Sequence, residues 1–472
     1  MKKAILKYSS LLALLSAPFF STQTMALECD LAVNTPGEII SPCTIGVVQT
    51  NETFDLIGNI SPGNGNVGIT FSAGPNTLNF TGDIGSDEAE RDAILFNSTD
   101  NNVLNMIGNL STTGNANAGI RLSNSSSLNT IVVDGNISST NGFGFNIDSS
   151  NSNNITMTGN IVSKLEGFYI LSAGSNIINL TGNISTTGRA ESGLYLNTSD
   201  SNTTNLTGNI TTTGDTAQGL RLFRSDSNTT TLTGNITTTG DTAVGLYLFR
   251  SDSNTITITG DIITSGTDGD SEAILIDNSD SNTITLSGKV QSLGGDQAIS
   301  ILANSDANTF NIQSGSTFLG DFENLGTNTV ITNRGTMDGI ENTGSIATFN
   351  NAQTGATYSG TLPVNYNIII NSRTEYGQMF VTSEAGSTDF GLSSVSTNLF
   401  NGKYSNVMTG VSDGNVGATR SGSLEGNGTS SAGTASWVLS ETASDSQACL
   451  LYTSDAADDS LRLDLGGRRI LK

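Results

Sequence analysis

Regularly spaced carboxylates are the first groups in this sequence that could do chemistry. A Ser-Asp-Ser-Asn or Ser-Asp-Ala-Asn turn recurs and supplies Asp200, Asp226, Asp252, Asp280 and Asp306. If the turns stack, calcium could bridge neighbouring carboxylates, because this ion takes oxygen ligands. The glycine-rich nonapeptide that forms dedicated calcium turns is absent. We therefore favour exposed turn aspartates, keep calcium as the weaker alternative, and expect no cofactor.

The asparagines of the same turns form a second column in register. They are Asn202, Asn228, Asn254, Asn282 and Asn308. Stacked asparagines can form hydrogen bonds from side chain to side chain along a rod. Asparagine also suits turns through local bonds to its own backbone. We predict a ladder at these five positions, with the local turn role as the alternative.

Catalytic chemistry has little support in this chain. It contains no histidine, which excludes a Ser-His-Asp arrangement and histidine-bound metal. Gly269-Asp270-Ser271 resembles a nucleophile motif but lacks a base, so we interpret it as a turn. No phosphate loop or dinucleotide fingerprint occurs. We predict that the protein is not an enzyme.

The enzymatic alternative is a polysaccharide lyase or hydrolase that carries arginines on one outer strand. Arg221, Arg224 and Arg250 are the candidates. Arg224 and Arg250 recur at the repeat interval, which favours a solvated stripe paired with Asp226 and Asp252 over a unique site.

Threonine columns suggest a third class, a protein that binds ice or crystals. One column comprises Thr203, Thr229, Thr255 and Thr283, and we expect Thr187, Thr213 and Thr239 on another strand. Threonine is also an ordinary outward residue of strands, so this is the lesser alternative.

A repeat marked by glycine must position all of these groups. Its ten glycines, 23 to 28 residues apart, are Gly58, Gly82, Gly108, Gly135, Gly159, Gly182, Gly208, Gly234, Gly260 and Gly288. Apolar residues stand two positions before and two positions after every glycine, which is the period of a strand. A third short apolar strand closes each repeat of about 26 residues. The pattern predicts an all-β, right-handed parallel β-helix of about ten regular coils.

The N-terminus predicts export. Three lysines precede an apolar run and a small-residue stop, so we interpret residues 1–26 as a signal peptide. Residues 27–53 follow as an N-terminal cap, in which Cys29 and Cys43 could form a disulfide in an oxidising compartment.

Composition divides the rest of the chain. We predict regular coils over 54–305, shorter irregular coils over 306–362, and a β-rich C-terminal cap over 363–448. No later segment is apolar enough to span a membrane as a helix.

The order of these segments resembles that of a known protein family. The leader, the Gly-Asn-Ile coils, the stretch Tyr366–Ile370 and Tyr376-Gly377-Gln378 resemble passengers of outer-membrane autotransporters with pectin-lyase-like β-helices. The resemblance covers residues 1–448 and implies a following β-barrel anchor, which this chain lacks. Residues 449–472 resemble a translated sequencing adapter, so we treat them as a non-native tail and expect the natural chain to continue past Ala448.

The resemblance implies an adhesive or structural rod at the cell surface, or in the periplasm for this fragment alone. Its expected partners are a host, neighbouring-cell or abiotic surface, with polysaccharide as one candidate ligand. Contact with a membrane would come only through the absent barrel. A net charge of −24 argues against nucleic acid.

Overall fold

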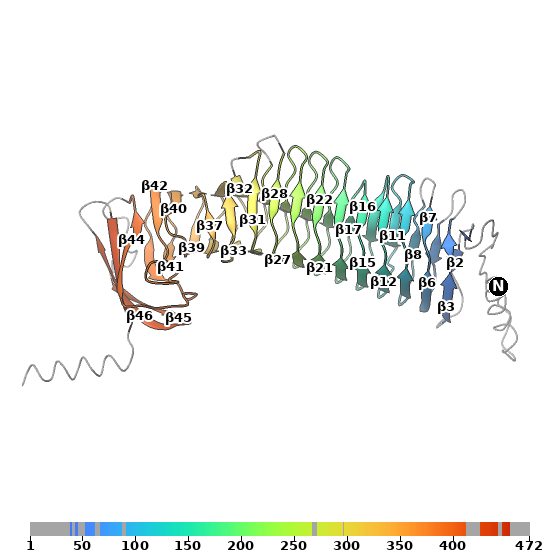
Figure 1. Ribbon diagram of the computed structural model, residues 1–472, viewed down its shortest axis with the longest axis horizontal. Helices are drawn as coiled ribbons and strands as arrows, with labels where there is room; N and C mark the ends of the chain where they lie inside the picture. The colour runs from blue at the N-terminus through green and yellow to red at the C-terminus, as the bar shows by residue number, and fades with distance from the viewer. Residues whose placement is uncertain are drawn as a thin grey trace, which may run out of the picture.

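The strands of this chain point alternate side chains inward, and they coil into a rod. The computed structural model describes residues 38–39, 43–45, 52–61, 67–86, 91–266, 271–295, 297–411, 425–441 and 446–453. These residues contain no helix. Most of their strands stack in parallel as a right-handed β-helix, which confirms the predicted fold (Figure 1).

Each regular coil contributes one strand to each of three sheets, in the order C, A, B. Sheet A comprises β1 (Glu38–Ile39), β4 (Asn59–Ile60), β7 (Ile84–Ser86), β10 (Leu110–Thr112), β13 (Ile137–Ser139), β16 (Ile161–Ser163), β19 (Ile184–Thr186), β22 (Ile210–Thr212), β25 (Ile236–Thr238), β28 (Ile262–Thr264), β31 (Lys289–Ser292), β34 (Thr317–Leu319) and β37 (Thr336–Met337). Sheet C comprises β3 (Glu52–Ile57), β6 (Asn76–Thr81), β9 (Val103–Ile107), β12 (Thr130–Asp134), β15 (Asn154–Thr158), β18 (Ile177–Thr181), β21 (Thr203–Thr207), β24 (Thr229–Thr233), β27 (Thr255–Ile258), β30 (Thr283–Leu286), β33 (Thr309–Ile312), β36 (Thr329–Asn333), β39 (Ile346–Asn351), β41 (Asn365–Ile368) and β43 (Asp389–Leu392).

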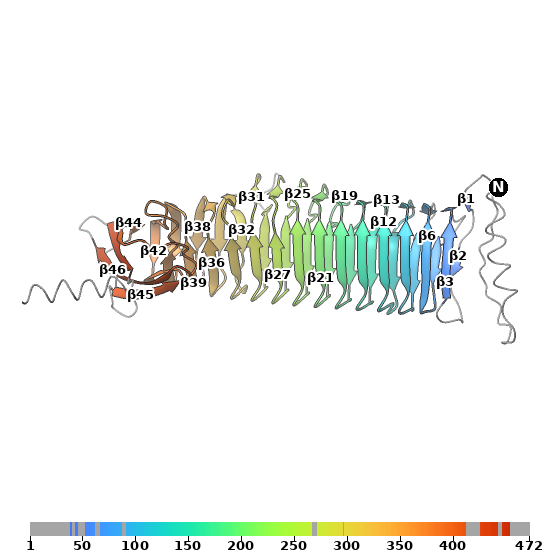
Figure 2. The ribbon, with the colours of Figure 1, turned by 60° about the horizontal axis from the view of Figure 1, so that its bottom comes forward.

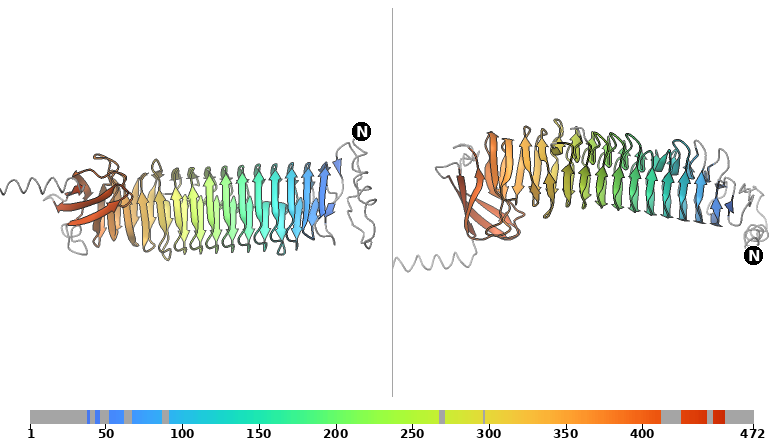
Figure 3. Two further views of the ribbon diagram at one scale, coloured as in Figure 1. Left: turned by 90° about the horizontal axis from the view of Figure 1, so that it is seen from below. Right: turned by 45° about the horizontal axis from the view of Figure 1, so that its top comes forward.

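Sheet B follows the same axis and ends in antiparallel strands. Its parallel strands are β2 (Cys43–Ile45), β5 (Ile69–Phe71), β8 (Ile94–Asn97), β11 (Ala118–Ser123), β14 (Phe143–Asp148), β17 (Phe168–Leu171), β20 (Leu194–Asn197), β23 (Leu220–Phe223), β26 (Leu246–Phe249), β29 (Ile274–Asp277), β32 (Gln297–Ile301), β35 (Asp321–Asn324), β38 (Gly339–Asn342), β40 (Ala356–Thr361), β42 (Met379–Ala385) and β44 (Gly402–Thr409). The strands β47 (Ser446–Thr453), β46 (Gly433–Glu441) and β45 (Glu425–Ser430) then pair in antiparallel fashion beyond β44. Figure 3 shows this cap at the end of the rod opposite the N-terminal strands.

The repeated glycine forms the corner between sheet C and sheet A. Gly182 has φ +150°, and a Cβ there would lie 2.0 Å from the carbonyl oxygen of Gly159, one coil earlier. The same collision recurs from Gly82 to Gly288, at 1.9 to 2.2 Å. Only glycine therefore lets successive corners approach at the spacing of a parallel sheet.

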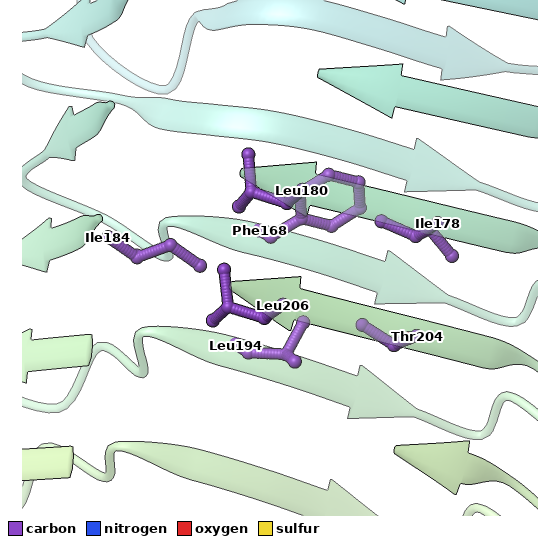
Figure 4. Close-up of a pocket in the computed structure, with 7 residues that line it drawn as sticks. All are labelled: Phe168, Ile178, Leu180, Ile184, Leu194, Thr204 and Leu206. Atoms are coloured by element: carbon purple, nitrogen blue, oxygen red, sulfur yellow. The ribbon is translucent and has the colours of Figure 1, made fainter. Parts of the chain in front are cut away.

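The core is a narrow column between the three sheets. Leu180, Ile184 and Leu194 are at most 3% exposed and represent its inward positions. Near them Thr204 replaces a larger apolar residue, and a gap beside it is too narrow for a water molecule (Figure 4). The Oγ1 atom of Thr204 is buried without a hydrogen-bond partner among the described residues.

The coils become shorter past Asn308. In the regular part, asparagines that bond to each other are 23 to 28 residues apart, and Asn202 and Asn228 are 26 residues apart. Asn324 and Asn342 bond to each other across only 18 residues.

Parallel coiling continues further than we expected, so the predicted start of the cap at residue 363 is too early. Strand β41 pairs in parallel with β39, β43 pairs with β41, and β44 pairs with β42. Pro363 lies in the turn between β40 and β41, where a proline removes no ladder hydrogen bond. Tyr366 and Ile368 still point into the core and are at most 1% exposed.

Several predicted segments lie wholly or partly outside the described residues. The signal peptide and most of the N-terminal cap are among them. Cys29 is not described, and for Cys43 only the backbone of β2 is described, so the disulfide stays a prediction. Strand β47 runs from Ser446 to Thr453 and therefore includes the first residues of the predicted tail.

Candidate binding surfaces

The turn asparagines form a buried ladder along the rod. The backbone N–H of Asn202 donates to Oδ1 of Asn228 at 2.8 Å, and Nδ2 of Asn202 donates to the same oxygen at 3.2 Å. The ladder runs through Asn76, Asn102, Asn129, Asn153, Asn176, Asn202, Asn228, Asn254, Asn282 and Asn308. All are at most 4% exposed. The five before Asn202 were missed because their turns differ, although each lies six residues before a corner glycine.

The aspartates of the same turns bind backbone amides. The Oδ1 atom of Asp200 accepts the N–H of Asp226 at 2.8 Å, and Asp226 does the same for Asp252 at 2.7 Å. Asp280 continues the row and accepts the N–H of Asp306 at 2.7 Å. Among the described residues, no three His, Cys, Asp or Glu side chains gather closely enough to hold a metal ion. The aspartate column thus accepts backbone amides of adjacent coils, and calcium binding stays a prediction.

Another ladder follows the glycine corners, and our sequence reasoning missed it. Oδ1 of Asn183 accepts the N–H of Asn209 at 2.8 Å, and Oδ1 of Asn209 accepts the N–H of Asn235 at 2.8 Å. These side chains are exposed. Their fixed place directly after each glycine was the available signal.

The outer face of sheet B carries a column of aromatic and arginine side chains. We call Phe143, Tyr169, Tyr195, Arg221 and Tyr247 the aromatic column. The rings of Phe143 and Tyr169 lie 5.7 Å apart, and those of Tyr169 and Tyr195 lie 5.1 Å apart, both stacked. The Arg221 guanidinium lies 4.7 Å from the Tyr195 ring and 5.8 Å from the Tyr247 ring. Neighbouring members therefore cover much of each ring face, and Tyr195 is only 8% exposed. The Tyr169 hydroxyl accepts a hydrogen bond from Nδ2 of Asn197 at 3.0 Å, and Tyr247 hydrogen-bonds to Asp277. Tyr169, Arg221 and Tyr247 are half-buried, so parts of these three side chains remain accessible to a ligand.

A carboxyl pair lies beside this column. Burial, together with the nearby Glu191 carboxylate, raises the pKa of Glu166 to about 8, and Arg221 only partly opposes this. Burial also raises the pKa of Tyr169 to about 12. The two glutamates hydrogen-bond to each other. Their carboxyl groups therefore lie much closer together than the roughly 5 to 9.5 Å that separates the carboxyl groups of glycosidases. The pair therefore does not fit that chemistry.

Arg224 and Arg250 lie over aromatic rings. Their guanidinium groups are 5.1 Å from the Phe223 ring and 5.0 Å from the Phe249 ring. The predicted pairing with the turn aspartates is wrong, because among the described residues the ion pair within 4 Å joins Arg121 and Asp92 and none joins Arg224 or Arg250 to an aspartate. Both arginines have φ +50°, a conformation in which each lies over the ring that precedes it.

The threonines divide between two environments. Thr203 and Thr229 begin strands of sheet C and are in register. The other predicted column, Thr187, Thr213 and Thr239, is not on a strand, and that prediction is wrong. These residues follow directly after the ends of β19, β22 and β25, where the chain leaves sheet A for the loop to sheet B.

The described part of the chain contains no helix that could span a membrane. No family model, curated protein or solved structure matches the chain.

Proposed function

We propose that this protein is an exported passenger of the autotransporter type that attaches to surfaces by binding extended polysaccharide along its aromatic column. The supporting observation is the column itself. It places rings, hydroxyl groups and a guanidinium on five adjacent coils, and the stacked rings of Phe223 and Phe249 lie at the next outward position of the same sheet. Four coil steps of about 4.8 Å give a length of about 19 Å.

The chemistry suits a linear chain of sugars. The Tyr169 hydroxyl accepts from Asn197 and can still donate, the Tyr247 hydroxyl donates to Asp277 and can still accept, and Arg221 offers donors in a fixed plane. Partly exposed ring edges give apolar contact beside these groups. Repetition along the rod axis lets several weak contacts act together on one polymer.

A binding assay with the full chain tests the proposal. Immobilised polysaccharides of neutral and acidic type are incubated with the wild type and with the double variant Tyr169→Phe and Tyr247→Phe. We expect at least one polysaccharide to bind and the double variant to bind about tenfold more weakly, because it keeps the stacked rings but loses both hydroxyl groups.

Tyr404→Phe is the matched control, since Tyr404 is buried and its hydroxyl donates to the Phe400 carbonyl away from the column. Equal binding by the wild type and the double variant would refute the role of the column. Release of shortened or unsaturated sugars from a bound polysaccharide would replace adhesion with an enzymatic function.

A further inference from the structure

Sheet C carries a two-dimensional array of threonines on its outer face. Figure 2 shows these strands side by side in one broad layer. We define the threonine patch as Thr203, Thr207, Thr229, Thr231, Thr233, Thr255, Thr257, Thr283, Thr285 and Thr309. Members on adjacent strands are direct register partners along the rod, including Thr203 with Thr229, Thr231 with Thr257, and Thr283 with Thr309.

The hydroxyl groups of the patch are available to water. Every member is exposed or half-buried, and within the described part of the protein no hydrogen bond occupies any of their Oγ1 atoms. The patch contains no charged or aromatic side chain. In β21, Asn205 stands between Thr203 and Thr207, at the position that Thr231 occupies in β24.

The spacing of the array is regular and rigid. Coils repeat at about 4.8 Å along the rod, and alternate residues repeat at about 6.6 Å along each strand. Threonine is β-branched, so its χ1 angle is restricted and each methyl and hydroxyl keeps its direction. The buried asparagine ladder fixes one end of these strands, and the glycine corner fixes the other.

We propose that the threonine patch binds the surface of ice. Its hydroxyl groups can anchor water molecules in a repeating pattern, and its methyl groups cover the space between them. Many weak contacts on one crystal plane add together when their spacing is fixed. A crystalline polysaccharide is the poorer occupant, because the patch offers no ring against which a sugar can pack.

Partitioning into growing ice tests this inference. The full chain carries a fluorescent label, and ice grows slowly from its solution. We expect the wild type to enter the ice and to inhibit ice recrystallisation. Thr257→Tyr, at the centre of the patch, should require about tenfold more protein for the same inhibition, because a protruding ring separates the two flat surfaces.

Thr237→Tyr is the matched control, since Thr237 faces outward from β25 on sheet A. It should behave like the wild type. Thr231→Lys serves as a second patch variant, and circular dichroism with thermal melting checks the folding of all three. Exclusion of the wild type from ice would overturn the inference, as would undiminished activity in both folded patch variants. Polysaccharide binding by the same preparations is a separate readout, because the aromatic column lies on another sheet.

Discussion

Replacing Glu166 by glutamine should remove a pH-dependent instability from the middle of the rod. Glu166 is 8% exposed, and burial with the Glu191 carboxylate raises its pKa from 4.5 to about 8. The native state therefore binds a proton between these two values that the unfolded chain has lost. The free energy of unfolding must fall as the pH rises through this range.

The pKa change sets the size of the effect. Each pKa unit corresponds to about 1.4 kcal/mol, so the full change corresponds to at most about 4 to 5 kcal/mol above pH 8. Rearrangement of Glu191 or entry of water would reduce this figure. Near pH 5 the glutamate is protonated, and Glu166→Gln should resemble the wild type. Near pH 9 the variant keeps a neutral side chain and should be more stable.

Thermal melting followed by circular dichroism between pH 5 and 9 provides the assay. Hydrogen exchange of the coils near Glu166 adds a local readout, which is useful because a repeat protein need not unfold in a single step. The exposed Glu375 supplies the control Glu375→Gln, which should keep the wild-type pH dependence. If Glu166→Gln and the wild type lose stability in parallel from pH 5 to 9, our account of the buried pair is wrong.

Three further substitutions test how the coils are held together, each read as a thermal midpoint and a denaturant midpoint. Gly182→Ala should destabilise the protein by about 3 kcal/mol or more, because of backbone strain and collision with the preceding corner. The control Gly315→Ala should lose only about 1 kcal/mol, because Gly315 has a positive φ but no atom within 4 Å of an added Cβ. Equal losses of stability in the two variants would refute the collision. Asn202→Ala leaves buried amides without their acceptor and should lower the free energy of unfolding by about 2 to 4 kcal/mol. The control Asn209→Ala, at an exposed asparagine, should lower it by about 1 kcal/mol or less. A reversed order would contradict the assignment of the buried ladder. Thr204→Val should stabilise by about 1 kcal/mol, because it removes an unpartnered buried hydroxyl at nearly constant shape; a loss of stability would show that the hydroxyl has a partner.

The ladders explain how an acidic rod with a thin core can stack its coils. Each turn places a side-chain oxygen against the backbone N–H of an adjacent coil, either from a buried asparagine such as Asn202 or from an aspartate such as Asp200. Amides that no strand pairs with are thereby satisfied, and a carboxylate gains favourable contact with a donor. The acidic turn columns are thus part of the structure of the rod.

The sequence alone determined the coil and its period. The corner glycines and the alternation of apolar residues around them are local signals, because strand geometry and the glycine backbone act within a few residues. The buried asparagine column was predicted from its register, although only its second half was recognised. Tertiary structure decided what the outward residues contact. Tyr169 and Tyr195 are 26 residues apart in sequence and form a stack only because their coils are neighbours. Whether Asp200 meets a metal ion or an amide likewise depends on the adjacent coil. Pairing between coils, rather than the local pattern, also decided how far the parallel helix extends past Pro363.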